Sequence, residues 1–123
     1  MIKQLLFVGL GGGLGSMLRF LTSMLVVRLY EHTFPLATFI ANILGCFLIG
    51  LFVGIFSQNI EIHQNLRFLL ITGFCGGYTT FSTFASENLS LFNTQQYGLA
   101  IFYIGGSIFA GLLAVWLGLA ITK

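Results

Sequence analysis

The side chains best suited to chemistry in this sequence gather in one short polar run. Residues 75–84 read Cys-Gly-Gly-Tyr-Thr-Thr-Phe-Ser-Thr-Phe and place five hydroxyl groups within six positions, inside an otherwise apolar stretch. Hydrocarbon tolerates polar or non-helical backbone only where it is buried in protein or lines a wet cavity. The two glycines favour an unwound turn, and carbonyl groups freed by such a turn can bind a cation. A glycine kink whose threonines bond back to their own helix is the structural alternative.

Two phenylalanines in this run have helical spacing. Phe81 and Phe84 are three residues apart, so they share one face of a resumed helix, with Ser82 and Thr83 beside them. The edges of aromatic rings are electropositive. A small anion can therefore lie against a ring edge while hydroxyl and amide donors replace its water, and no fixed charge traps it. Simple packing is the alternative role for these rings.

Four further polar positions lie inside other apolar segments. Asn42 is the only strongly polar side chain in the middle of its segment, and its amide can either bond another helix or donate to an ion. Tyr103 and Ser107 are four residues apart and share a helix face, so they can form a track of hydroxyl groups. Thr38 lies one turn before Asn42 and can do the same.

Two charged side chains also lie in or near apolar segments. An arginine at the position of Arg19 is costly in hydrocarbon and faces protein or water, so it either extends to the interface or attracts anions to a vestibule. Glu87, just after the polar run, either accepts from a buried donor or approaches the interface.

Enzymatic chemistry finds no support in the residue pattern. No histidine or cysteine accompanies a pair of carboxylates, and the spacing of metal ligands is absent. Cys46 and Cys75 fall in apolar segments, where cysteine behaves as a small hydrophobic residue, so neither a disulfide nor a zinc site is predicted. The protein is predicted not to be an enzyme.

The elements that position these residues are apolar segments of membrane-spanning length. Of the 123 residues, 57% are hydrophobic and 7% are charged, against about 25% charged in a soluble domain. A helix of about 20 apolar residues crosses the hydrocarbon core. Four segments reach that length, so residues 1–123 are predicted to form a single all-α transmembrane domain. The segments are residues 5–27, 36–56, 66–92 and 98–122, the first of them retained as a span because no signal-peptidase site follows it.

Pairs of glycines four residues apart mark faces where helices can approach closely. The pairs are Gly9/Gly13, Gly11/Gly15, Gly50/Gly54 and Gly73/Gly77. The first two pairs do not form a dinucleotide-binding loop, because no strand precedes them and the GxGxxG spacing is not met.

Charge gives only a weak orientation. Four spans place both termini on one side of the membrane. That side carries three basic residues, Lys3, Arg67 and Lys123, and the other side carries one, Arg28. The positive-inside rule thus favours cytoplasmic termini by one or two residues, a bias small enough for both orientations to insert. The net charge of +2 is scattered, so no nucleic-acid partner is predicted.

These motifs identify a resemblance that covers nearly the whole chain. Residues 11–20 (GGGLGSMLRF), 38–45 (TFIANILG) and 73–84 (GFCGGYTTFSTF) resemble the Fluc (CrcB-type) fluoride channels of bacteria. The resemblance implies four transmembrane helices with a break in the third, assembled as an antiparallel, dual-topology homodimer in the bacterial inner membrane. It also implies two fluoride pores and a central structural sodium ion.

The resemblance implies roles for individual residues as well. Phe81 and Phe84 would contact fluoride, Asn42 would donate to it, and Tyr103 and Ser107 would belong to a polar track, with Thr83 and Glu87 at polar positions of the third span. The carbonyl groups of Gly76 and Thr79 would bind sodium. The chain departs from some relatives at Gly111 and Val115, where the hydroxyl track is not continued.

The function expected from the resemblance is passive export of cytoplasmic fluoride. Two other functions are compatible with the same apolar, four-span composition. A proton-coupled multidrug exporter would need a carboxylate within its spans, for which Glu87 is the candidate. A non-transporting assembly subunit would account for the many packing glycines.

Overall fold

The computed structural model describes residues 1–59 and 61–123, and their regular structure is entirely helical. This confirms the all-α prediction. In chain order the elements are α1 (Ile2–Leu29), α2 (Leu36–Gln58), α3 (Gln64–Arg67), the π-helix η1 (Phe68–Cys75), α4 (Gly76–Tyr78), α5 (Phe81–Asn93) and α6 (Tyr97–Ile121).

Three of these helices are long and apolar enough to cross a membrane. They are α1, α2 and α6, with 28, 23 and 25 residues, and they match three of the four predicted segments within a few residues. The fourth predicted segment, residues 66–92, is not one helix. It consists of α3, η1, α4 and α5, with two non-helical residues between α4 and α5.

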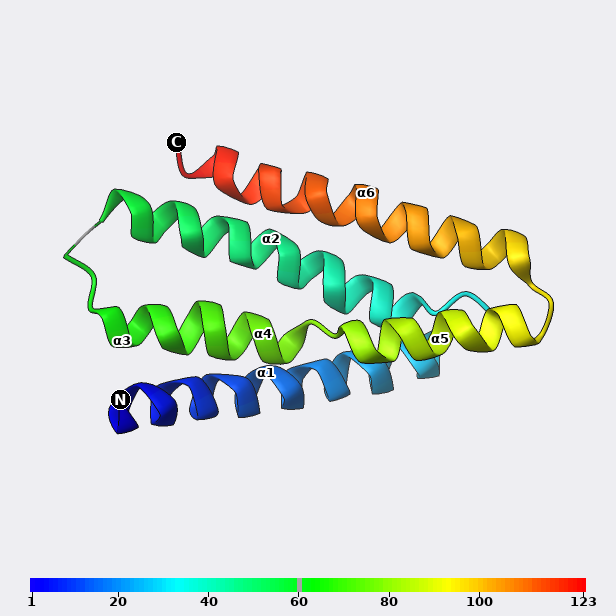
Figure 1. Ribbon diagram of the computed structural model, residues 1–123, viewed down its shortest axis with the longest axis horizontal. Coiled ribbons are helices and arrows are strands. Elements are labelled where there is room, and N and C mark those ends of the chain that lie inside the picture. Colours follow the sequence, from blue (N-terminus) through cyan, green and yellow to red (C-terminus); the bar gives the residue numbers. More distant parts are fainter. Residues whose placement is uncertain (60) are drawn as a thin grey trace.

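The helices run along a common long axis and pack in pairs (Figure 1). Helix α1 packs along η1 and α4, whereas α2 packs against α6, and α5 also contacts α6. Both termini lie at one end of the molecule together with the end of α2 and the start of α3 (Figure 1). The two halves of the broken segment therefore have different neighbours, α1 for the first half and α6 for the second.

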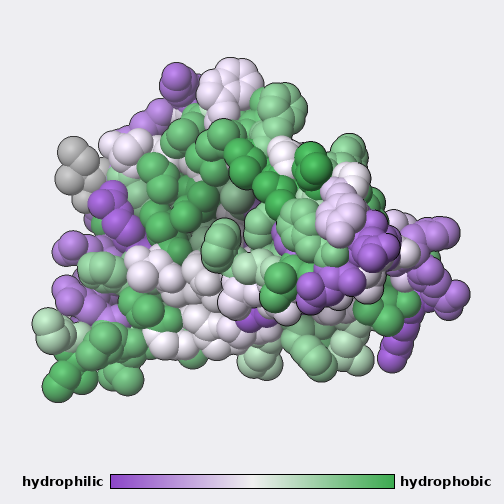
Figure 2. Space-filling model, turned by 45° about the vertical axis from the view of Figure 1, so that its right-hand side comes forward, coloured by the Kyte–Doolittle hydropathy of each residue, from purple (hydrophilic) through white to green (hydrophobic). Residues whose placement is uncertain are grey.

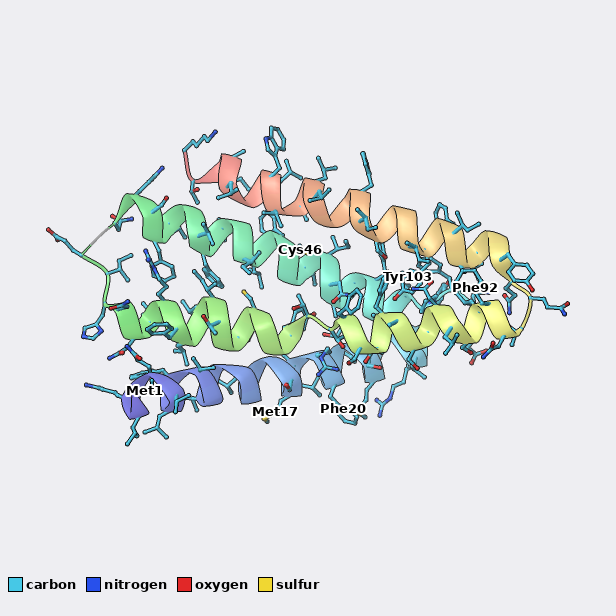
Figure 3. The ribbon with its side chains drawn as sticks, viewed as in Figure 1. Met1, Met17, Phe20, Cys46, Phe92 and Tyr103 are labelled. Atoms are coloured by element: carbon cyan, nitrogen blue, oxygen red, sulfur yellow. The ribbon has the colours of Figure 1, made fainter. Side chains whose placement is uncertain are left out.

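A small aromatic core fills the space between α5 and α6. Tyr103 is fully buried and packs with Leu91 and Ala100, while Phe84 and Phe92 cover this group from α5. Figure 3 shows Tyr103 and Phe92 between the two helices.

Much of the outer surface is hydrophobic. Figure 2 shows hydrophobic residues across the middle of one face and hydrophilic residues gathered toward its ends. On α1, Met17 and Phe20 are each 65% exposed and point away from the rest of the chain (Figure 3). On α6, Phe109 and Trp116 are similarly exposed. Such a surface is unsuited to water and suited to hydrocarbon or to another apolar surface.

The glycine pairs on α1 and the broken segment permit backbone contact. A Cβ atom at Gly11 would collide with the carbonyl group of Leu69, and one at Gly15 with that of Phe74. From the opposite side, a Cβ atom at Gly77 would collide with the carbonyl group of Gly12. The predicted close approach is confirmed here, and it holds α1 directly against the residues before the break.

The other two pairs behave differently from each other. A Cβ atom at Gly50 would collide with the carbonyl group of Val115, and one at Gly54 with the side chain of Thr122, so this pair seats α6 on α2 as predicted. Gly9 and Gly13 have no atom of the described chain within 4 Å of a built Cβ atom. Within one chain, the prediction of a close approach at this pair is wrong, because these glycines lie on the outer side of α1.

These contacts predict unequal effects of two similar substitutions. Gly11→Ala should lower the free energy of unfolding by about 1–3 kcal/mol, because the methyl group forces apart two helices in backbone contact. Gly9→Ala on the same helix should leave stability unchanged or slightly raised, since its methyl group enters open space and alanine favours the helix. Thermal unfolding of both variants in detergent, followed by circular dichroism, measures the difference. Equal stabilities would contradict the packing described.

Candidate ion-binding site

The helix break falls on two threonines. Thr79 (φ −80°, ψ 156°) and Thr80 (φ −149°, ψ 122°) are extended, between the end of α4 and the start of α5 (Figure 1). Gly76 is helical, with φ −63° and ψ −35°. The expectation that the glycines themselves unwind is therefore wrong. Gly77 is needed for contact with α1, and the chain leaves the helix two residues later.

Asn42 pairs with both backbone groups of Thr80. Its Nδ2 donates to the Thr80 carbonyl oxygen at 3.1 Å, and the Thr80 N–H donates to its Oδ1 at 2.7 Å. The side-chain amide thus supplies the partners that a continuous helix would have supplied. Of the two roles considered for Asn42, bonding to another segment is what the structure shows. One N–H of Nδ2 is left over from this pair and remains available as a donor.

The threonines are held by local hydrogen bonds. The Thr79 hydroxyl donates to the Cys75 carbonyl oxygen at 2.9 Å, which is the back-bonding considered as the structural alternative. The Thr80 hydroxyl caps α5 by accepting from the Thr83 N–H at 3.3 Å. The break is therefore ordered by its own side chains as well as by Asn42.

Arg19 also contacts the break. Its Nε donates to the Gly77 carbonyl oxygen at 3.2 Å, and the residue is half-buried. The side chain therefore points at the broken segment. Arg19 lines a cavity of about 270 Å³ with hydroxyl side chains from three helices, which are Ser16, Ser23, Thr38, Thr80 and Thr83.

Two carbonyl groups at the break lack internal partners. Among the described residues, none donates a hydrogen bond to the carbonyl oxygen of Gly76 or Thr79. Gly76 is exposed, and no atom lies within 4 Å of a Cβ atom built on it. These oxygens are the ones that the sequence resemblance associated with a cation.

A second cavity lies on the other side of Thr80. It has a volume of about 280 Å³ and brings together five of the residues named from sequence, which are Asn42, Thr79, Phe81, Phe84 and Ser107, along with Ile43, Cys46, Thr80 and Ile108. No side chain that is charged at neutral pH lines it. Cys46 was not predicted here, because a thiol in an apolar segment gives no signal that distinguishes a cavity wall from packing.

The side chains that line this cavity differ in exposure, packing and hydrogen bonding. The rings of Phe81 and Phe84 have centroids 5.9 Å apart, and Phe81 is 78% exposed while Phe84 packs on Tyr103 at 4.9 Å. The Ser107 hydroxyl is buried and has no hydrogen-bonding partner among the described residues. An unpaired buried hydroxyl costs free energy unless a ligand or water satisfies it.

Glu87 joins three helices. Its Oε2 accepts from the Thr38 hydroxyl and its Oε1 from the Tyr103 hydroxyl, both at 2.8 Å. The interpretation of Glu87 as a partner for buried donors is confirmed. The predicted hydroxyl track therefore contains a carboxylate at its centre, and Tyr103 is oriented by that carboxylate.

The structure separates the remaining predicted residues. Thr83 lines the Arg19 cavity, not the phenylalanine cavity. Ser82 is exposed, lines neither cavity, and lies 3.5 Å from the Thr80 hydroxyl. Different faces of α5 therefore line the two cavities, because neighbouring residues on a helix point about 100° apart.

Three long apolar helices and a polar helix break flanked by cavities define a multi-pass integral membrane protein. The family model described as "CrcB-like protein, Camphor Resistance (CrcB)" matches residues 6–119. The chain belongs to this family.

Curated relatives are similar to this chain over almost its whole length. The chain is 49% identical to the Flavobacterium psychrophilum protein named "Fluoride-specific ion channel FluC" over 122 residues, which cover 99% of this chain and 98% of that protein. Proteins of the same name from Azobacteroides pseudotrichonymphae and Pseudomonas syringae are 46% and 42% identical over 123 residues, covering all of this chain and 98% and 99% of theirs. By these names the family is one of ion channels, not enzymes.

The pairing between Asn42 and Thr80 predicts a measurable loss of stability. Asn42→Leu leaves the Thr80 N–H and C=O without partners and should destabilise the protein by about 1–3 kcal/mol for each buried group. The neighbouring substitution Ile43→Leu also alters the cavity wall but should cost less than about 1.5 kcal/mol. Thermal unfolding in detergent compares the two variants, and hydrogen exchange at the Thr80 amide reports the pairing directly. Equal losses would show that Asn42 does not stabilise the break.

Proposed function

We propose that this chain is a fluoride channel that passes F⁻ passively across the bacterial inner membrane and so exports toxic cytoplasmic fluoride. The relatives named fluoride-specific ion channels support the ion. The observation that carries the proposal is the 280 Å³ cavity beside the break, where aromatic rings and neutral donors meet without a charged side chain.

In this proposal neutral groups replace the water that fluoride loses. The edges of Phe81 and Phe84 present positive electrostatic potential, and the free N–H of Asn42 and the unpaired Ser107 hydroxyl donate hydrogen bonds. A site without a full positive charge binds the ion and still releases it. Conduction requires both steps.

The Arg19 cavity serves as the vestibule. Thr80 lines both cavities, so the Arg19 cavity and the phenylalanine cavity lie on either side of this residue. A cationic side chain at the mouth raises the local concentration of anions. The carboxylate of Glu87 and the hydroxyl groups of Thr38 and Tyr103 continue the polar track from there.

No energy source other than the membrane potential is needed. HF crosses the bilayer as a neutral acid and dissociates inside. The interior-negative potential contributes about 2.3 kcal/mol per elementary charge per 100 mV, and it drives the anion outward through a passive pore.

The functional unit in this proposal is an antiparallel, dual-topology homodimer with four transmembrane spans per chain. The broken segment from α3 to α5 is the additional span, and it runs alongside the three long helices (Figure 1). Phe81 lines the cavity beside the break but is 78% exposed, so a single chain leaves this ring largely uncovered. A second copy would complete each of two pores, and the small difference in charge between the two ends is compatible with both orientations.

The break in this proposal also holds a structural sodium ion between the two copies. The carbonyl oxygens of Gly76 and Thr79 are free of internal donors, and hard cations prefer such oxygen ligands. Gly76 is open on its outer side, as a site shared with a second chain requires. Bound sodium would supply positive charge that offsets the carbonyl dipoles.

Ion flux from liposomes tests the proposed function. Liposomes that contain the purified protein should release fluoride and not chloride, whereas empty liposomes should release neither. Phe81→Ile removes one ring edge and should slow fluoride release about tenfold, because an aromatic contact contributes about 0.5–1.5 kcal/mol. Asn42→Asp places a negative charge in the cavity and should reduce release to background.

A matched control separates the pore from general damage. Phe109→Ile changes a ring of similar exposure, 72%, on the outside of α6 and should leave release unchanged. Absence of fluoride release from liposomes that hold intact protein would refute the channel.

Sodium dependence tests the cation site. The melting temperature of the protein in detergent should rise with sodium concentration, because an ion that binds only the folded state stabilises it. Gly76→Leu should abolish that rise, since its side chain enters the space beside the free carbonyl oxygens. Gly105→Leu is the control, because Gly105 on α6 is equally open and lies outside the break. A sodium-dependent rise that persists in Gly76→Leu would argue against a site at the break.

A further inference from the structure

Arg67 is held at the end of the molecule that contains both termini. Its Nη2 donates to the Phe56 carbonyl oxygen at 3.1 Å, and its guanidinium carbon lies 5.6 Å from the centre of the Phe56 ring. Phe56 is buried, with 3% of its surface exposed. The arginine is therefore fixed on the last turns of α2. A guanidinium group carries five N–H donors, and among the described residues only Nη2 of Arg67 has a partner.

Two adjoining cavities meet at Arg67. One has a volume of about 340 Å³ and is lined by Phe56, Ser57, Ile62, Gln64 and Arg67. The other has a volume of about 280 Å³ and is lined by Val53, Phe56, Ser57, Arg67 and Ile71. They share Phe56, Ser57 and Arg67, so they adjoin and together make a paired cavity. Its outer part carries polar side chains, and its inner part is an apolar groove between α2 and η1.

We propose that this paired cavity binds one anionic phospholipid. The phosphate group lies against the free N–H donors of Arg67, the polar head contacts Ser57 and Gln64, and an acyl chain follows the groove along Val53 and Ile71. Arginine suits this position because its planar donors match phosphate oxygens. The polar, cationic and apolar parts of the site thus follow one another as the head group, phosphate and acyl chain do in a phospholipid.

Charge at this end of the molecule favours an anionic head group. Lys3 and Lys123 lie at the same end as Arg67, near the two termini (Figure 1), and outnumber Glu61, which lies in the link between α2 and α3 at this end. Basic side chains near a membrane surface attract anionic lipid. Because the Phe56 carbonyl group already positions the guanidinium, little conformational entropy is lost when it binds a phosphate.

The wall of the groove has an unusual backbone. The π-helix η1 begins directly after Arg67 and spans eight residues, among them Ile71. π-helical turns are rare and occur mostly as single turns near functional sites. The wider turn changes the angular spacing of side chains along η1, and Ile71 faces the groove in this arrangement.

Native mass spectrometry tests the site directly. The purified full-length protein in detergent, mixed with palmitoyl-oleoyl phosphatidylglycerol, should retain bound lipid. Arg67→Gln should reduce retention about tenfold through loss of the charged donors, and Ile71→Trp should reduce it similarly by filling the groove. Arg67→Lys keeps the charge without the planar donors and should retain an intermediate amount. Arg28→Gln, at the opposite end of the molecule, should retain as much as the unmodified protein.

Further arms separate the lipid from other occupants. Inorganic phosphate should not displace the lipid, and phosphatidylcholine should bind less than phosphatidylglycerol. Displacement by phosphate, or full retention by Ile71→Trp, would overturn the proposal in favour of a site for a soluble anion. Conversion of dimers to monomers by Ile71→Trp would overturn it in favour of a second copy of the chain. Equal retention by Arg67→Gln and Arg28→Gln would overturn it outright, once circular dichroism shows that each variant keeps its helix content.

Discussion

The rest of the structure depends on one constraint, which is that backbone groups released by a helix break must find partners where water is scarce. At Thr80 a side-chain amide from α2 supplies both an acceptor and a donor. At Gly77 the partner is a guanidinium group from α1. Each unpaired group would cost several kcal/mol in an apolar surrounding. The break therefore exists only because two neighbouring helices carry polar side chains at the matching depth.

Those side chains reach the break because small residues bring the helices into contact. Gly11 and Gly15 place α1 directly on the backbone of η1 and α4, and Arg19 follows one turn after Gly15. On the other layer, Gly45 packs against the side chain of Thr79, only three residues after Asn42. Close packing and polar pairing are thus coupled. Moving either helix outward by the width of a methyl group would lengthen the hydrogen bonds that satisfy the break.

The same arrangement leaves a limited set of groups without internal partners. They are the carbonyl oxygens of Gly76 and Thr79, one N–H of Asn42 and the hydroxyl of Ser107. Gly76 is exposed, whereas Thr79 lines the same cavity as the two donors, Asn42 and Ser107. Three of these four groups therefore belong to residues that line the phenylalanine cavity.

Residue patterns were enough to predict the membrane class, three of the long helices, a break near residues 75–84 and most of the residues around it. Hydropathy and the hydroxyl cluster are local sequence patterns, so they can be detected without a structure. The three-dimensional structure was needed to place the break on Thr79 and Thr80, because Gly77 is helical and contacts Gly12 of α1. It also decided that Asn42 and Arg19 complete the break, that Glu87 joins Thr38 to Tyr103, and that Cys46 lines the cavity. These pairings join residues as many as 58 positions apart. Their geometry depends on how α1, α2 and α6 pack, which residue spacing within one helix does not encode.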